Sequence, residues 1–161
     1  MVAGSQAEKK SENKIYVMKW SDMYKTDKED EIDSDMDSDE ENEKYREPIM
    51  RFETVAHKGC INKIRSMYGS PIVATWSEDG EVGIYNISQA IEELDKPVSS
   101  KKQFGGCKIQ GFKHKMEGFA LEWSPLTYGR LASGGRDAAL WLYQAADESC
   151  STFVKETQVG L

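Results

Sequence analysis

The 161-residue sequence has few cysteines and no long apolar run. Cys60, Cys107 and Cys150 are widely separated, so the chain has no Cys-x-x-Cys pair of the kind that indicates a zinc site or thiol redox chemistry. No stretch of about 18 apolar residues occurs, and residues 1–10 lack the apolar segment of a secretory signal. These absences predict a soluble, intracellular protein with reduced cysteines.

Signatures of catalysis are also missing. The sequence contains no Gly-x-Ser-x-Gly elbow, no His-Glu-x-x-His zinc motif and no glycine-rich phosphate loop. Its two histidines, His57 and His114, therefore have no partner from these motifs with which to form a catalytic site. We predict a protein that is not an enzyme, has no catalytic or metal-binding residues and needs no cofactor.

Acidic residues are concentrated in one segment. Residues 27–47 hold twelve carboxylates against three basic residues, a net charge of −9, whereas the whole chain has a net charge of −7. The rest of the chain is therefore nearly neutral, unlike a nucleic-acid-binding surface, which shows a basic stripe facing phosphates. Residues 27–47 also have too few large apolar side chains to offset their ordering entropy, so we predict a disordered loop there.

The remaining composition favours β-strands. Four tryptophans, seven tyrosines and five phenylalanines stand among many valine, isoleucine and threonine residues, and these residue types are common in strands. Residues 15–20 form a compact β-forming run after a polar turn, so we predict a strand there. The four tryptophans, which we expect to pack in the core or between sheets, are Trp20, Trp76, Trp123 and Trp141.

Two segments of the chain, residues 55–86 and 112–144, resemble each other. Both carry a histidine, an aspartate between two apolar runs, and a terminal tyrosine. These landmarks are His57, Asp79 and Tyr85 in the first copy, and His114, Asp137 and Tyr143 in the second. The histidine precedes the aspartate by 22 and 23 residues, and the tyrosine by 28 and 29. Such self-similarity indicates two copies of one structural unit.

Each copy has the pattern of a β-hairpin. In the first, residues 71–76 and 81–85 flank Asp79-Gly80, a pair typical of tight turns because glycine accepts positive φ. In the second, the corresponding turn keeps Asp137 but has alanine in place of glycine. Between the copies, Ser88 is placed to cap a short helix, and a linker follows. This insert lengthens the repeat spacing beyond the usual value of about 40 to 45 residues.

The two copies resemble WD repeats. Ala56-His57 and Lys113-His114 stand at the family's Gly-His position, and Tyr85-Asn86 and Tyr143-Gln144 at its Trp-Asp position. The family implies that the histidine and the turn aspartate belong to a buried hydrogen-bond network that braces each blade. The resemblance therefore gives His57 with Asp79, and His114 with Asp137, purely structural roles, together with the terminal tyrosines.

One subfamily resembles nearly the whole chain. The glutamate-rich WD-repeat proteins of ribosome assembly have an N-terminal hairpin, an acidic low-complexity loop, and then phrases similar to three segments of this sequence. The matching segments are the hairpin at residues 2–6 and 14–20, and the phrases at residues 59–65, 73–82 and 114–125. The last phrase, from His114 to Pro125, is the most specific.

This resemblance implies a seven-bladed β-propeller found in the nucleus and nucleolus. Its members chaperone a large-subunit ribosomal protein, L-three in the usual naming, during 60S assembly in pre-ribosomal particles. The related histone-binding WD proteins leave a second interpretation open, a histone-binding chromatin adaptor on the same scaffold. Neither interpretation involves a membrane or direct sequence-specific binding of nucleic acid.

The predicted architecture is all-β and covers part of a propeller, with about two blades and an N-terminal strand. The expected divisions are a strand hairpin at 1–26, the acidic loop at 27–47, a first repeat at 48–87, a short helix and linker at 88–111, a second repeat at 112–146, and the start of the next connection at 147–161. A propeller closes when an N-terminal strand completes its last blade. With so few blades, residues 14–20 are expected to have no sheet to join.

The acidic loop is the candidate client-binding segment. Its carboxylates, which would steer a cationic ribosomal protein or histone electrostatically, include Asp33, Asp35, Asp37, Asp39, Glu40, Glu41 and Glu43. The alternative is a solvated spacer that only maintains solubility. Ser34 and Ser38 each precede an acidic residue by three positions, which makes them candidate phosphorylation sites for acid-directed kinases. The basic stretches 101–102 and 113–115 are interpreted as a solvated face.

Overall fold

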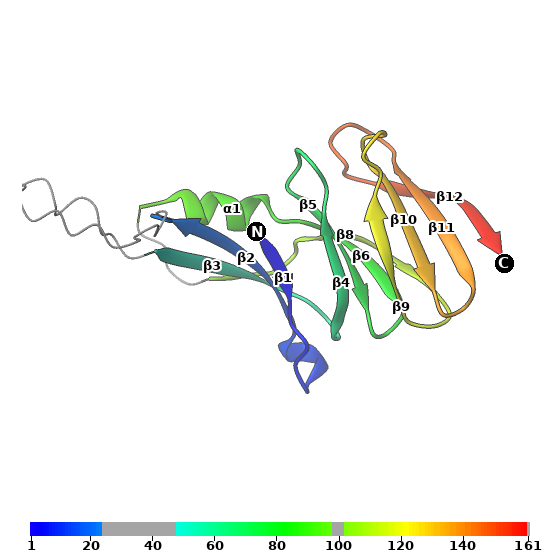
Figure 1. Cartoon of the computed structure of the whole chain (residues 1–161), viewed down its shortest axis with the longest axis horizontal. Coiled ribbons are helices and arrows are strands. Elements are labelled where there is room, and N and C mark those ends of the chain that lie inside the picture. Colours follow the sequence, from blue (N-terminus) through cyan, green and yellow to red (C-terminus); the bar gives the residue numbers. More distant parts are fainter. Residues whose placement is uncertain (24–47, 98–101, 161) are drawn as a thin grey trace, which may run out of the picture.

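The computed structural model describes residues 1–23, 48–97 and 102–160, and within these ranges the chain forms three four-stranded sheets (Figure 1). All strand pairs are antiparallel except one. The prediction of an all-β protein built from propeller blades is confirmed. The predicted acidic loop, residues 27–47, lies outside the described residues.

The first sheet combines the N-terminal hairpin with two later strands. Its order is β1 (Val2–Gly4), β2 (Lys14–Ser21), β3 (Ile49–Ala56) and β7 (Gln103–Phe104), with β7 parallel to β3. A short 3₁₀ helix, η1 (Lys10–Glu12), lies between β1 and β2. Strand β2 pairs with β3 along its whole length, from Lys14 opposite Ala56 to Ser21 opposite Ile49.

This sheet corrects the expectation that residues 14–20 have no sheet to join. Residues 49–56 were expected to belong to the first repeat, but they satisfy the backbone hydrogen-bonding groups of β2 instead. The acidic segment thus connects two paired strands. An insertion at the end of a hairpin leaves the register of both strands unchanged, so its length does not disturb the sheet.

The second sheet is the blade of the first repeat. Its order is β4 (Ile61–Ser66), β5 (Ile72–Ser77), β6 (Glu81–Asn86) and β8 (Lys108–Lys113). Gly80 has a φ of 78° in the turn between β5 and β6, and a β-carbon there would lie 2.8 Å from the carbonyl oxygen of Met116. Glycine is therefore required at this turn both by its conformation and by the close approach of backbone.

The described part of the predicted helix and linker, residues 88–97 and 102–111, contains more secondary structure than expected. Helix α1 (Ser88–Asp95) is followed by β7 and by the start of β8, because the outermost strand of the second sheet falls within the predicted linker. Ser88 was expected to cap the helix but is its first residue. The acceptor at this end is the side-chain oxygen of Asn86, 2.9 Å from the backbone nitrogen of Ser88.

The third sheet is the blade of the second repeat. Its order is β9 (Gly118–Trp123), β10 (Arg130–Gly135), β11 (Ala139–Ala145) and β12 (Phe153–Gly160). The turn without glycine places Ala138 at a φ of 55°, in the left-handed region. Residues 147–161 were expected to begin the next connection, but β12 pairs with β11 and completes this sheet, because β11 has a second edge to satisfy.

Two apolar clusters hold the three sheets together. One lies between the second and third sheets and includes Trp76, Leu121, Leu131, Tyr143 and Phe153. The other lies where the first sheet, the second sheet and α1 meet, and contains residues such as Ile15, Val55, Val73, Ala90 and Leu94. Within the described ranges, no helix is long and apolar enough to cross a membrane.

Candidate functional site

The second histidine occupies the centre of a buried polar chain. Its Nδ1 lies 3.2 Å from each carboxylate oxygen of Asp137, and its Nε2 lies 2.9 Å from Ser133 Oγ, which is 2.9 Å from the hydroxyl of Tyr143. The rings of His114 and Tyr143 and the hydroxyl of Ser133 are all buried. The structure therefore brings together His114, Asp137 and Tyr143, as the WD-repeat resemblance implies.

This chain also links two blades through aromatic stacking. The ring of His114 packs between two indoles, with centroid distances of 4.4 Å to Trp76 on β5 and 4.0 Å to Trp141 on β11. The ammonium group of Lys155 lies 3.2 Å from the centroid of the Trp141 ring on its outer side. His114 therefore forms hydrogen bonds within the third sheet and also packs against tryptophans of both the second and the third sheet.

The first histidine makes a different set of contacts. His57 Nδ1 lies 3.0 Å from the carbonyl oxygen of Gly59, and its Nε2 lies 3.0 Å from Thr75 Oγ1. Thr75 also bonds the hydroxyl of Tyr85. The chain of histidine, hydroxyl and tyrosine is therefore repeated in the first blade.

The expected pairing of His57 with Asp79 is wrong. The carboxylate of Asp79 instead pairs with the ammonium group of Lys10, which η1 places beside the turn between β5 and β6. Because the carbonyl of Gly59 already accepts the proton of His57 Nδ1, the aspartate is available for this exposed partner. The pKa of Asp79 is lowered, first by its hydrogen bond with Lys10.

The folded protein favours the neutral form of both histidines. Burial lowers the pKa of His57 and of His114, and for His114 the hydrogen bond that its Nδ1–H donates to Asp137 opposes this effect without reversing it. A neutral ring fits the second network, because Nδ1–H then donates to Asp137 while Nε2 accepts from the hydroxyl of Ser133. Burial likewise raises the pKa of Tyr143, which keeps its hydroxyl protonated.

These pKa shifts predict that stability falls on mild acidification. Both histidines have a folded-state pKa below the unfolded value of 6.5, so the unfolded chain binds protons first. Their contribution is present above pH 6.5 and is lost as the pH falls below it. We expect the melting temperature to decrease between pH 7.5 and 5.5. A double variant, His57→Gln and His114→Gln, should be less stable at pH 7.5 and show a flatter profile. Equal slopes for both proteins would contradict this prediction.

Several members of the networks were not predicted from the sequence. Thr75 and Ser133 carry the hydroxyl groups that bond the histidines, and Trp141 stacks on His114. A signal was present, because Thr75 follows its histidine by 18 residues and Ser133 follows its own by 19. Both residues thus stand at the same place in the two repeats.

The predicted client-binding residues and phosphorylation sites are not placed by the structure. They lie outside the described residues and comprise Asp33, Asp35, Asp37, Asp39, Glu40, Glu41 and Glu43, with Ser34 and Ser38. Their attachment points are known, because β2 ends at Ser21 and β3 begins at Ile49, and these two residues are paired. The segment therefore starts and returns at one end of the first sheet.

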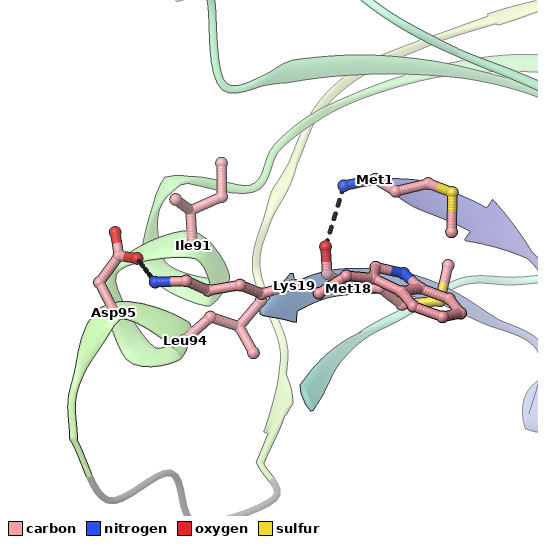
Figure 2. Close-up of a pocket in the computed structure, with 7 residues that line it drawn as sticks. Met1, Met18, Lys19, Ile91, Leu94 and Asp95 are labelled. Atoms are coloured by element: carbon pink, nitrogen blue, oxygen red, sulfur yellow. Dashed lines mark hydrogen bonds and ion pairs between the residues drawn. The ribbon is translucent and has the colours of Figure 1, made fainter. Parts of the chain in front are cut away.

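A groove lies at the same end of the first sheet (Figure 2). It has a volume of about 390 Å³ and is lined by Met1, Met18, Lys19, Trp20, Ile91, Leu94 and Asp95. Figure 2 shows the ion pair between Lys19 and Asp95 at its rim, with a distance of 2.6 Å. The side chain of Trp20 is 48% exposed here, which corrects the expectation that it packs in the core.

Comparisons with known proteins find relatives that are named as WD-repeat proteins. The chain is 36% identical to "Glutamate-rich WD repeat-containing protein 1" of Dictyostelium discoideum over 98% of its own length. It is 33% identical to "Ribosome assembly protein rrb1" of Schizosaccharomyces pombe over 82% of its length. The chain is related to the glutamate-rich WD-repeat proteins. The resemblance predicted from the sequence is thereby confirmed.

The relationship covers only part of each relative. The chain spans about a third of the length of these relatives, 34% and 28% respectively. A more distant group of relatives aligns with 55% of the chain. One member, "Histone acetyltransferase type B subunit 2" of Gibberella zeae, is 36% identical to the chain in the aligned region, which covers 20% of that relative's length. No protein-family model matches the chain.

Proposed function

We propose that the protein acts in ribosome assembly as a non-enzymatic scaffold that binds a basic protein client. The observation that carries this proposal is the alignment of 82% of the chain with a relative named as a ribosome assembly protein. The proposed client is a large-subunit ribosomal protein, L-three, bound during 60S assembly in the nucleus and nucleolus. Ribosomal proteins are strongly cationic, and the chain offers a matching anionic segment.

The geometry supports binding rather than catalysis. Both histidines, the residues best suited to acid–base chemistry near neutral pH, are neutral and have both ring nitrogens engaged within a blade. The blades therefore serve as a rigid frame. The acidic segment is attached to this frame at the paired ends of β2 and β3, so it is presented next to a folded surface rather than at a chain terminus.

The acidic segment is expected to dominate client affinity. Deleting residues 27–47 should weaken binding of purified L-three by at least roughly tenfold at low salt, because the net charge of −9 steers and holds a cationic partner. Wild-type affinity should fall steeply between 50 and 300 mM salt, since exposed charges are screened. Isothermal titration calorimetry measures both effects. Unchanged affinity and salt dependence after the deletion would refute the docking role.

The candidate phosphorylation sites provide a graded form of the same test. A Ser34→Asp, Ser38→Asp variant adds negative charge where phosphate would add roughly −1.5 to −2 per site. It should bind L-three more tightly than the wild type, whereas Ser34→Ala, Ser38→Ala should match the wild type. Equal affinity of the two variants would show that these serines do not tune binding.

A histone client is the second candidate. It is favoured by the relatives named as subunits of histone acetyltransferase type B, which match 55% of the chain. Competition between L-three and a histone H3–H4 preparation for the full chain distinguishes the two, because both are basic and only specific contacts separate their affinities. Preference for the histones would replace the ribosomal proposal.

A further inference from the structure

Two neighbouring turns carry exposed apolar side chains at one end of the second and third sheets. Tyr68, in the turn between β4 and β5, is 96% exposed, and Leu126, in the turn between β9 and β10, is 94% exposed. Tyr128 in the second turn is half-exposed. The strands that lead into these turns are joined where the indole nitrogen of Trp123 donates to the carbonyl of Arg65 at 3.0 Å, and Figure 1 shows both turns at the same end of the sheets. We call these three exposed side chains the turn surface.

The backbone of both turns is ordered. Each turn contains a tyrosine followed by a glycine with positive φ, 68° at Gly69 and 71° at Gly129, a conformation that glycine adopts without strain. The hydroxyl of Ser124 accepts from two backbone nitrogens of its turn, at 3.2 and 3.0 Å. In the other turn the backbone nitrogen of Met67 donates to the carbonyl of Ile72 at 2.9 Å. Exposed side chains on an ordered backbone lose less freedom on binding than those on a mobile loop, so the turn surface is preorganised for a contact.

The two turns themselves carry no charge. Residues 66–71 and 124–129 contain no acidic or basic side chain. The arginines that flank them are paired within the sheets, because Arg65 lies 2.8 Å from a glutamate of β9 and Arg130 lies 3.0 Å from a glutamate of β12. Neither turn therefore offers the free cation with which proteins hold the phosphate groups of nucleic acids.

The turn between β11 and β12 adds two carboxylates beside the turn surface. It is joined to the turn between β9 and β10 by the hydrogen bond from the backbone nitrogen of Ala145 to the carbonyl of Gly129, at 2.9 Å. Its Asp147 and Glu148 form no ion pair with a basic side chain in the part of the chain that the structure describes. Hydrogen bonds from two serine hydroxyls of the same turn lower the pKa of Asp147 to about 2. A ligand that combines positive charge with a planar or apolar group is therefore favoured.

We propose that the turn surface binds an extended, arginine-containing segment of a protein partner. Guanidinium groups of the segment stack on the rings of Tyr68 and Tyr128, and Leu126 contacts the aliphatic stems of the arginines. Asp147 and Glu148 attract the positive charge. Arginine fits this surface better than lysine, because its planar group stacks on aromatic rings and is less strongly hydrated. This contact is separate from the acidic segment and goes beyond the proposed function.

Two labelled peptides of equal charge test the proposal on the full chain. One alternates arginine and serine over about ten residues, roughly two strand lengths, and the other alternates lysine and serine. Fluorescence anisotropy should show that the arginine peptide binds about fivefold more tightly, because lysine stacks less well on the tyrosine rings. Equal affinity of the two peptides would overturn the proposal.

Variants locate the preference for arginine. Combining Tyr68→Ser with Tyr128→Ser should abolish the preference, whereas combining Tyr68→Phe with Tyr128→Phe should keep it, since the ring and not the hydroxyl makes the contact. Phe119→Ser is the matched control and should also keep it, because Phe119 is an exposed aromatic residue at the other end of β9. A preference that survives the double serine variant would show that the arginines bind elsewhere and would refute the turn surface.

Deleting residues 27–47 separates the turn surface from the acidic segment. The deletion should weaken binding of both peptides by the same factor and leave the ratio of their affinities unchanged. If the deletion weakens neither peptide, the docking role proposed for the acidic segment fails, while the turn surface stands. If it removes the preference for arginine, that preference belongs to the acidic segment and the turn surface is refuted.

Two other occupants of the turn surface give different results. Bases of single-stranded RNA also stack on exposed aromatic rings. Binding of a short oligouridine that is tighter than binding of the arginine peptide, and that is lost in the double serine variant, would overturn the proposal. A dimer in sedimentation velocity that dissociates in the same variant would show that a second copy of the chain occupies the surface, and would overturn it as well.

Discussion

Replacing Trp76 with alanine should lower the free energy of unfolding by about 4 kcal/mol, the largest loss expected of any single substitution considered. The indole is completely buried in the cluster between the second and third sheets. It packs on the ring of His114, and a β-carbon at Gly118 would lie 2.4 Å from it. Alanine would leave a cavity in the contact that joins two blades. Urea unfolding followed by circular dichroism measures the loss.

The variant Trp76→Phe is the informative control. The indole nitrogen of Trp76 is buried and has no hydrogen-bond partner among the described residues, so phenylalanine removes an unsatisfied donor while keeping an aromatic ring. Loss of the unpaired donor offsets part of the lost volume, and we expect a cost of about 1 to 2 kcal/mol. Equal destabilisation by alanine and phenylalanine would show that the nitrogen contributes to stability.

Replacing His114 with alanine is expected to cost about 3 kcal/mol, since it removes one buried hydrogen-bond partner from Asp137 and one from Ser133. It also removes the ring that packs between Trp76 and Trp141. His57→Ala should cost less, because His57 bonds a backbone carbonyl and a threonine rather than a carboxylate. Thermal unfolding of the two variants in parallel shows which substitution lowers the melting temperature more.

The structural role of both histidines also makes a prediction about binding. Each ring is buried, so client affinity measured on folded protein should be nearly unchanged in His57→Ala and His114→Ala. The variant Asp137→Asn is a further control, because its amide oxygen still accepts from His114 Nδ1 and should preserve most of the stability. Selective loss of client binding at an unchanged melting temperature would contradict a purely structural role for the two histidines.

Local pattern was sufficient to predict the strands of the two repeats. The apolar runs on either side of Asp79-Gly80, and their counterparts around Asp137, predicted hairpins that the structure contains as β5 with β6 and β10 with β11. The repeated spacing of histidine, aspartate and tyrosine indicated two copies of one unit, and the resemblance of these copies to WD repeats implied the network of His114. These features depend on residues close in sequence, or on a unit that occurs twice, so one chain carries enough information to find them.

The partners of strands and of polar side chains were harder to predict. Residues 49–56 were predicted to belong to the first repeat, but they form β3 of the first sheet. The segments that form β7, β8 and β12 were predicted to be linker or connection, but each is a strand of one of the three sheets. A strand shows its apolar face in its own sequence but not the identity of its neighbour. The pairing of Asp79 with Lys10 joins residues 69 positions apart, and no local pattern indicates such a contact.

The sequence by itself determined that this protein is all-β, that it contains two WD-like units, and that its negative charge is gathered in residues 27–47. Only the tertiary structure decided that Trp20 is exposed at one end of the first sheet and that α1 packs against β2 and β3. The reason is physical. Composition and periodicity fix which face of an element is apolar, whereas the packing of elements far apart in the chain decides whether that face is covered.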